Sequence, residues 1–483
     1  SIAAAGGAMA SPSAKIGVPQ PRQNVEDEET DCPADQGGQD EWADEWVEQS
    51  ITDIKVATIG NVDSGKSTLV GVLTKGMLDD GRGLARSRVF NFSHEAANGR
   101  TSSIAQEIMG FRETGEAVVS DKPGAVTAAS RNATWHQVVN QSQKLVTFID
   151  LCGHEKYLKT TIFGLVGLCP DYAMIIVNAN AGFQRMSREH LGIALALRIP
   201  FLFVVTKIDM APKNVYEENL AMLHSIVKSK AIRRQPLLLS DETELENAST
   251  ALVDDRAVPI IRVSSVTGEG LPLLRGLLQR LPTRLQSSGL FKPPSAPAEF
   301  HVDSIFNVHG VGLVVGGLMR AGHVRPNQQL LMGPDKSSQF KPVLVKTIHR
   351  NRAQTEAVGS GQHCAFALRS LVKRETLKKS HFRKGMVLVD AAIQPKATWC
   401  FRAEIVILHH ATTIKERYQA IIHCGIIRQS AAVIHMSNEL LRSGDKAIVT
   451  FRFMYHGEFL HGGVPLLFRE GRTKGLGRVL EIL

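Results

Sequence analysis

The stretch from Ile54 to Leu73 constrains the fold of this chain more than any other. It begins with an apolar run, Ile54–Ile59, that is rich in β-branched residues and long enough for one buried strand. The run leads directly into GNVDSGKS, which matches the pattern G-x-x-x-x-G-K-[ST] at every fixed position. The apolar residues that follow predict a helix. Strand, glycine-rich loop and helix in this order indicate a phosphate-binding loop, so we expect a nucleoside triphosphate site.

Each residue type in this loop has a physical role in binding phosphate. Glycines let backbone amides approach the phosphates, and the following helix N-terminus adds partial positive charge. Lys66 would neutralise the β- and γ-phosphates, and the Ser67 hydroxyl would ligate Mg²⁺. The loop residues predicted to bind the nucleotide are Gly60, Asn61, Val62, Asp63, Ser64, Gly65, Lys66, Ser67 and Thr68.

Composition is that of an ordinary globular protein of about three domains, with 483 residues, 43% hydrophobic and 21% charged. Arg198 and Lys207 interrupt the most apolar region, so no membrane span is expected. The 6 cysteines are scattered and form no C-x-x-C pair, which argues against a disulfide framework and a zinc site. This pattern favours a reducing compartment, and we expect a cytoplasmic location.

Charge is distributed very unevenly along the chain. Residues 1–50 carry a net charge of −9 and are predicted to form an acidic, disordered arm. Residues 292–483 hold 27 Lys and Arg against 13 Asp and Glu, a net charge of +14, which favours a polyanionic partner such as RNA. Two basic clusters are the predicted contact points: Lys373, Arg374, Lys378, Lys379, Arg383 and Lys384, and further on Arg469, Arg472, Lys474 and Arg478.

The chain divides by pattern into one α/β domain and two β-barrels. Residues 51–290 alternate apolar strands with helical segments, which predicts a doubly wound, mostly parallel sheet. A proline-rich linker at 291–298 separates this domain from short β-branched strands, which predict barrels at 299–395 and 396–483. The candidate strands of the first domain are Ile54–Ile59, Leu145–Asp150, Ala173–Asn178, Phe201–Thr206 and Ile260–Ser264, with weakly patterned inserts at 110–143 and 237–259.

Two further motifs predict the groups that surround the terminal phosphate. Asp150 ends an apolar strand and can hold Mg²⁺ through water, and the amide of Gly153 can meet the γ-phosphate. Thr101, in the segment GRTSSI, can complete the coordination of Mg²⁺ only while that phosphate is present. The predicted metal ligands are therefore Ser67, Thr101 and Asp150.

The base is predicted to be guanine. Asp209, in Thr206-Lys207-Ile208-Asp209, can accept two hydrogen bonds from the N1–H and exocyclic amine of guanine, a pair that adenine lacks. Ser264, Ser265 and Val266 follow a later strand and can offer backbone amides to the guanine O6.

These motifs occur in the order GNVDSGKST, GRTSSI, DLCGHEKY, TKID and SSVTGEG. Together with two barrels they resemble the translational GTPases of the elongation factor Tu and 1-alpha superfamily. The segments LDDGRGLAR, GHEKYLKTT and REGRTKGLG are similar to the family of GTP-binding protein 1 and GTP-binding protein 2. The resemblance covers residues 51–483 and implies cycling between GTP and GDP with Mg²⁺, and action at the ribosome. It also implies that His154 positions the attacking water, with Lys66 and Thr101 as the other catalytic residues.

Three positions depart from the pattern of these GTPases. Thr206 replaces the usual asparagine, so we expect loss of an amide that braces the phosphate loop and weaker nucleotide binding. Ser64 replaces a common histidine, with no expected consequence. Arg100 stands where tRNA-delivering factors often carry an isoleucine that shields His154 from water, which puts the apolar gate on basal hydrolysis in question.

The leading hypothesis is a ribosome-associated GTPase in elongation or ribosome rescue, monomeric off the ribosome. Its partners would be ribosomal RNA and the GTPase-activating surface of the ribosome, with tRNA, aminoacyl-tRNA and RNA-decay factors as further candidates. The alternative is a GTP-dependent adaptor with little hydrolysis that links ribosomes to RNA-decay factors. A GTPase for small molecules, as in sulfate activation, is disfavoured by the basic barrels.

Overall fold

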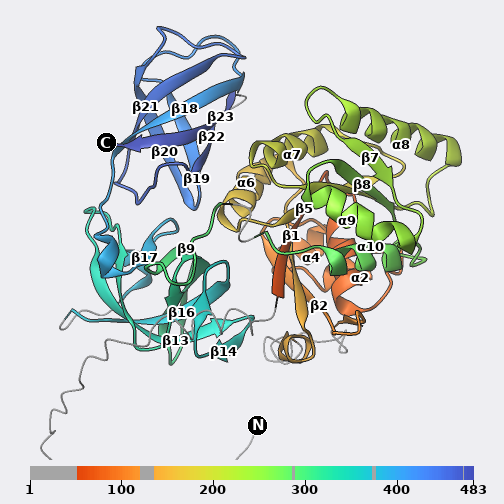
Figure 1. Ribbon diagram of the computed structural model, residues 1–483, viewed down its shortest axis with the longest axis horizontal. Coiled ribbons are helices and arrows are strands. Elements are labelled where there is room, and N and C mark those ends of the chain that lie inside the picture. Colours follow the sequence, from red (N-terminus) through yellow and green to blue (C-terminus); the bar gives the residue numbers. More distant parts are fainter. Residues whose placement is uncertain (1–51, 120–134, 285–288, 373–376, 471–472) are drawn as a thin grey trace, which may run out of the picture.

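The computed structural model describes residues 52–119, 135–284, 289–372, 377–470 and 473–483. The acidic arm predicted for residues 1–50, and the basic residues Lys373, Arg374 and Arg472, lie outside them. The α/β domain lies on one side of the molecule and two β-barrels stack on the other (Figure 1). No helix of these described segments has both the length and the apolar character needed to cross a membrane.

The α/β domain is built on a sheet of eight strands in the order β3-β2-β4-β1-β5-β6-β8-β7. Strand β1 lies near the middle, paired in parallel with β4 and β5, and its residues from Ile54 to Gly60 are buried. Such burial requires helices on both faces, which explains why most residues of this strand are apolar. The strands are β1 Thr52–Gly60, β2 Ala105–Phe111, β3 Ala117–Val118, β4 Lys144–Asp150, β5 Tyr172–Asn178, β6 Phe201–Thr206, β7 Gln235–Leu238 and β8 Ala257–Arg262.

Helices cover both faces of this sheet (Figure 1). One apolar core joins α2, α9 and α10 to one face, and another joins α6, α7 and α8 to the opposite face. The helices are α2 Lys66–Lys75, α3 Leu84–Ser87, α4 Ser93–Asn98, α6 Leu158–Gly167, α7 Arg185–Ala196, α8 Lys213–Lys228, α9 Leu245–Val253 and α10 Leu271–Arg280, with 3₁₀ turns η1 Glu155–Tyr157 and η2 Glu242–Glu244.

Central strands of the α/β domain were predicted better than the strands at its edges. The predictions for β1, β4, β5 and β6 are confirmed within two residues. The strand predicted at Ile260–Ser264 is displaced, because β8 begins at Ala257, where pairing with β7 starts, and ends at Arg262. Strands β2, β3 and β7 were not predicted. The edge strands β3 and β7 pair on one side only and carry a weaker apolar pattern, whereas β2 is a buried inner strand whose sequence, AQEIMGF, includes polar residues. Within the described part of the chain, the first insert contains β3 and helical residues at 135–140, and the second contains η2 and α9.

The first barrel runs from β9 to β17. Its ring follows the order β12-β17-β9-β10-β16-β13 and closes through pairing of β12 with β13. Alternate residues point inward, so that Phe300 and Phe366 stack with ring centroids 4.4 Å apart. The strands are β9 Glu299–Val308, β10 Gly312–Ala321, β11 His323–Val324, β12 Gln329–Gly333, β13 Lys341–Arg350, β14 Ala353–Thr355, β15 Val358–Gly359, β16 His363–Ser370 and β17 Val387–Val389, with 3₁₀ turns η3 Lys379–His381 and η4 Ala391–Ile393.

The second barrel is closed in the order β18-β21-β20-β19-β22-β23. Its core is aromatic, with Phe401 in contact with Phe451 and Phe453. The strands are β18 Cys400–His409, β19 Gln419–Cys424, β20 Ile427–Met436, β21 Lys446–Phe453, β22 Pro465–Glu470 and β23 Thr473–Ile482. The predicted fold class, an α/β phosphate-loop domain followed by two β-barrels, is therefore confirmed.

Both barrels dock on the α/β domain. Lys55 on β1 is buried and donates a hydrogen bond from Nζ to the carbonyl oxygen of Gly361 in the first barrel, at 2.8 Å. Burial lowers the pKa of Lys55, and the nearby Asp53 and Asp171 carboxylates oppose that effect. In the second barrel, Leu467 and Leu476 pack into the apolar core formed by α6 and α7.

Several basic residues predicted to face RNA instead hold the domains together. Arg383 forms an ion pair with Glu458 of the second barrel, at 2.7 Å. Lys384 lies 5.5 Å from the ring centroid of Phe163 on α6, and Lys474 pairs with Glu189 on α7. For Arg383 and Lys474 the prediction is wrong, because their cations pair with carboxylates of a neighbouring domain, which linear charge density does not reveal. Lys384 is exposed, and for it the prediction stays a prediction. Among the described members of the clusters, Lys378, Lys379, Lys384 and Arg478 are exposed.

Candidate nucleotide site

The phosphate loop lies where strands of the parallel sheet end together. Gly60 closes β1 opposite Ile176 of β5, and a Cβ at Gly60 would overlap the Ile176 carbonyl oxygen. Gly65 has φ of 88°, in the left-handed region that favours glycine, and α2 begins at the next residue. The adjacent carboxyl ends of β4, β5, β6 and β8 bring the other predicted motifs to the same edge.

Three oxygen-bearing side chains from separate segments meet at the start of α2. The Ser67 hydroxyl donates to Asp150 Oδ2 at 2.6 Å and lies 2.7 Å from the Thr101 hydroxyl. Thr101 Oγ1 is 3.5 Å from the same Asp150 oxygen, while Asp150 Oδ1 accepts from Thr58 at 3.1 Å. The predicted metal ligands are therefore brought together.

These three side chains fit a hard divalent cation. Hydroxyl and carboxylate oxygens are the donors that Mg²⁺ prefers, and here they converge beside the phosphate loop. Burial raises the pKa of Asp150, opposed by the hydrogen bond from Ser67 and the charge of Lys66. A cation bound here would favour the ionised carboxylate that coordination requires.

Lys66 and Gly153 are packed closely together. Lys66 Nζ donates to the Asn61 carbonyl oxygen at 2.6 Å, across the mouth of the loop. A Cβ at Gly153 would lie 2.5 Å from Lys66 Nζ and 2.8 Å from the Asn61 carbonyl oxygen, so only glycine fits without displacing the loop. Burial lowers the pKa of Lys66, an effect opposed by Asp150.

His154 is exposed and lines both cavities beside the phosphate loop. Its Nδ1 accepts a hydrogen bond from the Lys156 backbone N–H at 3.1 Å, which caps the turn η1. Neutral histidine that accepts at Nδ1 carries its proton on Nε2. His154 can therefore donate a hydrogen bond from Nε2 to water or phosphate oxygen.

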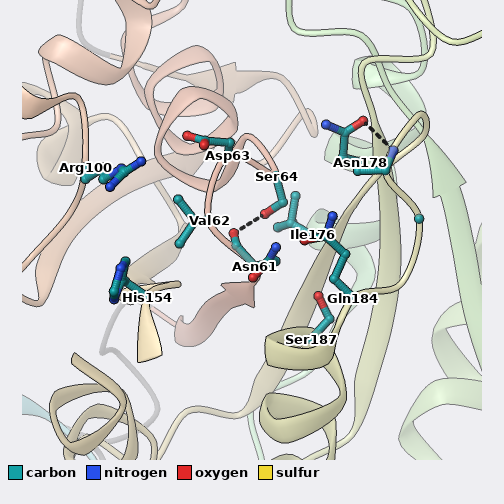
Figure 2. Close-up of a pocket in the computed structure, with 12 residues that line it drawn as sticks. Asn61, Val62, Asp63, Ser64, Arg100, His154, Ile176, Asn178, Gln184 and Ser187 are labelled. Carbon is teal, nitrogen blue, oxygen red and sulfur yellow. Dashed lines mark hydrogen bonds between the residues drawn. The ribbon is translucent and has the colours of Figure 1, made fainter. Parts of the chain in front are cut away.

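Two adjoining cavities surround the phosphate loop. The larger, of about 400 Å³, extends toward α7 and is lined by Asn61, Val62, Asp63 and Ser64, together with Arg100, His154, Gln184 and Ser187 among others. The second is lined by loop residues from Val62 to Thr68 and by Arg86, Gly99, Arg100, Thr101, Gly153 and His154. Arg100 and His154 lie on one side of the loop, and Gln184 and Ser187 on the other (Figure 2). A guanidinium thus occupies the place predicted for an apolar gate.

Glu95 holds the segment that carries Thr101. This buried carboxylate accepts hydrogen bonds from the backbone and side chain of both Ser102 and Ser103 through Oε1, at 2.7–3.0 Å. Although burial opposes it, these hydrogen bonds lower the pKa of Glu95. The polar loop is therefore anchored next to the predicted metal ligands.

On the side of the site that is predicted to bind guanine, the structure corrects the expectation for Thr206. Its hydroxyl donates to the Ser64 carbonyl oxygen at 2.7 Å, so the brace on the phosphate loop is retained with a hydroxyl in place of an amide. Lys207 follows with φ of 59°, and Asp209 is exposed in the same turn. The prediction of a lost brace is wrong, because the threonine lies close enough to bond the loop directly.

The loop after β8 also reaches this edge. Buried Ser264 accepts hydrogen bonds at Oγ from the Val266 and Thr267 backbone N–H groups, at 3.2 and 3.0 Å. The Ser265 carbonyl oxygen accepts from the Asp79 backbone N–H at 2.9 Å. This loop is thus ordered by its own hydrogen bonds and tied to the segment after α2.

Comparisons with known proteins agree with this geometry. The model of the "Elongation factor Tu GTP binding domain" matches residues 52–283. GTP-binding protein 1 of Xenopus laevis is 45% identical over 436 residues, which are 90% of this chain and 64% of that protein. Human GTP-binding protein 2 is 43% identical over 437 residues, or 90% of this chain and 70% of that protein.

The chain belongs to the family of GTP-binding proteins 1 and 2, among the translational GTPases. It spans 64% of the length of the Xenopus relative. Solved structures share its fold at low identity. Elongation factor SelB from Methanococcus maripaludis, in complex with the GTP analogue GPPNHP, has a TM-score of 0.61 and 16% identity, covering 90% of this chain and 80% of that one. The GTP-bound Ski7 GTPase-like domain of S. cerevisiae has a TM-score of 0.63 and 11% identity, covering 90% and 98%.

Several residues of this translational GTPase were missed from the sequence. His190 on α7 is fully buried and accepts a hydrogen bond at Nδ1 from the Gly60 backbone N–H at 3.1 Å, and burial lowers its pKa to about 3. Glu95 and Arg86 were also missed. No local sequence pattern marks His190, whose partner Gly60 is distant in the sequence, or Glu95, whose partners Ser102 and Ser103 follow within the same polar segment. Arg86 stands inside LDDGRGLAR, a segment that the sequence marks only by its resemblance to the family.

Proposed function

We propose that this protein is a ribosome-associated GTPase that binds GTP with Mg²⁺ and hydrolyses it to GDP and phosphate. The observation that carries this proposal is the convergence of Ser67, Thr101 and Asp150 oxygens beside a cavity that His154 also lines. A switch that senses γ-phosphate needs these groups together.

The proposed roles follow from the geometry. Lys66 and the loop amides would hold the β- and γ-phosphates. Ser67, Thr101 and Asp150 would hold Mg²⁺, which would neutralise phosphate charge. His154, with its proton on Nε2, orients the water whose oxygen attacks the γ-phosphorus. Asp209, Lys207 and the loop Ser264–Val266 hold the guanine, and Thr206 braces the phosphate loop.

Single-turnover GTP hydrolysis with and without ribosomes tests the proposal. We expect ribosomes to accelerate hydrolysis by the wild type. His154→Ala should keep its affinity for GTP and lose about 10²- to 10³-fold of the stimulated rate, as is typical for one preorganised catalytic group. Wild-type turnover by this variant on ribosomes would exclude the role given to His154.

A second candidate function is a GTP-dependent adaptor that hydrolyses GTP slowly and links ribosomes to RNA-decay factors. Arg100 favours it, because an exposed cation beside His154 replaces an apolar gate. Similarity of fold to a GTP-bound GTPase-like domain is consistent with it. Binding of GTP and of ribosomes without stimulated hydrolysis would select this function.

We further propose that tRNA or aminoacyl-tRNA contacts the cavity between the α/β domain and the first barrel, in the cytoplasm where ribosomes translate. This cavity of about 450 Å³ is lined by Trp135, Phe306, His349, Arg352 and Lys384 among others, a mixture of rings and cations that suits a stacked base or acyl group and a phosphate. Protection of aminoacyl-tRNA from deacylation by the GTP-loaded protein tests this partner, and Phe306→Ala should weaken it.

A further inference from the structure

The segment from Leu78 to Arg88, which contains LDDGRGLAR, has no role in the function proposed so far. It begins at the guanine side of the site, where the Asp79 backbone N–H donates to the Ser265 carbonyl oxygen at 2.9 Å. The Asp79 carboxylate in turn accepts from the Ala85 backbone N–H at 2.9 Å. Asp79 therefore links the guanine loop to helix α3.

Asp80 shapes the turn that leads into α3. Its Oδ1 accepts hydrogen bonds from the backbone N–H groups of Arg82, Gly83 and Leu84, at 2.8, 3.0 and 3.1 Å. The same hydrogen bonds, that of Leu84 foremost, lower the pKa of Asp80. The turn is thus held in one conformation by the protein itself.

Helix α3 is packed tightly on α2. A Cβ at Gly71 of α2 would overlap the Ala85 carbonyl oxygen, and Ala85 is fully buried. Because α2 begins at the phosphate loop, this contact sets the position of α3 relative to that loop.

The residue after Ala85 is Arg86, and it lines the cavity that contains Lys66, Ser67 and His154. Its guanidinium lies against Gly99, where an added Cβ would be 3.2 Å from Nη2. Within the described residues it forms no ion pair, although Asp79 and Asp80 precede it in the same segment. A half-buried cation without a carboxylate, held at a phosphate site, is suited to an anionic ligand.

We propose that Arg86 contacts the terminal phosphate of GTP and stabilises the charge that develops during hydrolysis, so that the chain supplies its own catalytic arginine. This inference rests on the proposed function and adds one residue to that site. The water oxygen bonds to the γ-phosphorus, the bond from that phosphorus to the β–γ bridging oxygen breaks, and its electron pair stays on GDP. A proton of the water ends on the released phosphate. The guanidinium stays protonated throughout and donates hydrogen bonds to phosphate oxygens.

The test compares Arg86→Ala and Arg86→Lys in the full chain with a matched control, Arg82→Ala, which removes the same charge from an exposed position in the same turn. Formation of a complex with GDP and aluminium fluoride, which mimics the transferring phosphoryl group, is followed with fluorescent GDP. GDP affinity, thermal unfolding and ribosome-free single-turnover hydrolysis are measured alongside.

We expect Arg86→Ala to lose the aluminium fluoride complex and to slow hydrolysis by about 10²- to 10³-fold, the effect of removing one preorganised donor. Affinity for GDP should change by less than about threefold, and thermal stability should match that of Arg82→Ala. Arg86→Lys should recover part of the rate, because an ammonium keeps the charge but cannot bond two oxygens in one plane.

Hydrolysis and complex formation in Arg86→Ala equal to those of Arg82→Ala would overturn the inference. So would a loss of GDP affinity as large as the loss of rate, which would make Arg86 a ground-state ligand. If the wild type forms the complex and added ribosomes do not accelerate its hydrolysis, the proposed ribosome role is refuted and the inference stays supported. A wild type that binds GDP and never forms the complex would refute the inference alone.

Discussion

Both the nucleotide site and the surfaces of the barrels carry charged residues in short sequence segments. The sequence predicted the surroundings of these residues at the nucleotide site and failed to do so on the barrels. At the site, Ser67 donates to Asp150 as the short motifs predict, and the charge of Lys66 acts on the same carboxyl group. On the barrels, Arg383 and Lys474 belong to equally dense segments, yet they pair with Glu458 and Glu189 of neighbouring domains. A motif at the end of a parallel strand therefore predicts its surroundings, because such ends gather at one edge of the sheet. The sequence of a basic cluster on a barrel does not predict the surroundings of its side chains, since their partners depend on how the domains dock.

The largest expected effect tests the guanine side of the nucleotide site. Asp209→Asn should weaken GTP binding by about two to four orders of magnitude, because two charge-assisted hydrogen bonds are worth roughly 1.5–3 kcal/mol each. Affinity for xanthosine triphosphate should rise in the same variant. Equilibrium titration with fluorescent nucleotides measures both, with exposed Glu218→Gln on α8 as control. Unchanged affinity for GTP would remove Asp209 from the site.

The next effect tests the barrel surfaces. Arg383→Ala should destabilise the folded chain by about 3–5 kcal/mol, since it leaves the buried Glu458 carboxylate without its cation. Lys378→Ala, an exposed neighbour in the same basic segment, should stay within about 0.5 kcal/mol of the wild type. Urea unfolding measures both variants. Equal stability of the Arg383→Ala and Lys378→Ala variants would show that Arg383, like Lys378, only faces solvent.

The pH dependence of the free energy of unfolding provides a second test of the same ion pair. Burial raises the pKa of Glu458 from 4.5 to about 7, opposed by Arg383. Because the folded-state pKa is raised, the stability that Glu458 contributes is fully present below pH 4.5 and is lost as pH rises through about 7. The stability of the wild type relative to Glu458→Gln should therefore fall by about 3 kcal/mol between pH 4.5 and pH 8. Unfolding curves across this range check it, and a constant difference would contradict the shift.

The smallest effect concerns the basic residues that stay exposed. Reversing Lys378, Lys379 and Arg478 to glutamate should weaken binding of ribosomal or transfer RNA. It should also flatten the slope of log affinity against log salt by about 0.7–0.9 for each phosphate that is no longer neutralised. Filter binding across a salt series measures the slope, with Lys213→Glu on α8 as control. A slope unchanged by the three reversals would show that the barrels do not hold RNA through these residues.

Much of the fold and of the candidate site could be predicted from the sequence. The residues Gly60 to Thr68, Asp150, Thr206 and Asp209 stand directly at the ends of apolar strands, and the structure brings those ends to one edge. The edge strands β3 and β7 were missed because each pairs on one side only. Strand β2, although buried, was missed because Gln106 and Glu107 interrupt its apolar pattern, and β8 was displaced.

The order of domains, the phosphate loop and the motifs around the nucleotide follow from the sequence without any structure, because each depends on residues adjacent along the chain. The folded chain was needed to show that Glu95 anchors the loop of Thr101, that His190 supports Gly60, and that the Thr206 hydroxyl braces Ser64. It was also needed to show which basic residues join domains. The physical reason is that a hydrogen bond or ion pair acts over about 3 Å between groups whose separation along the chain is unconstrained, so no local pattern records it.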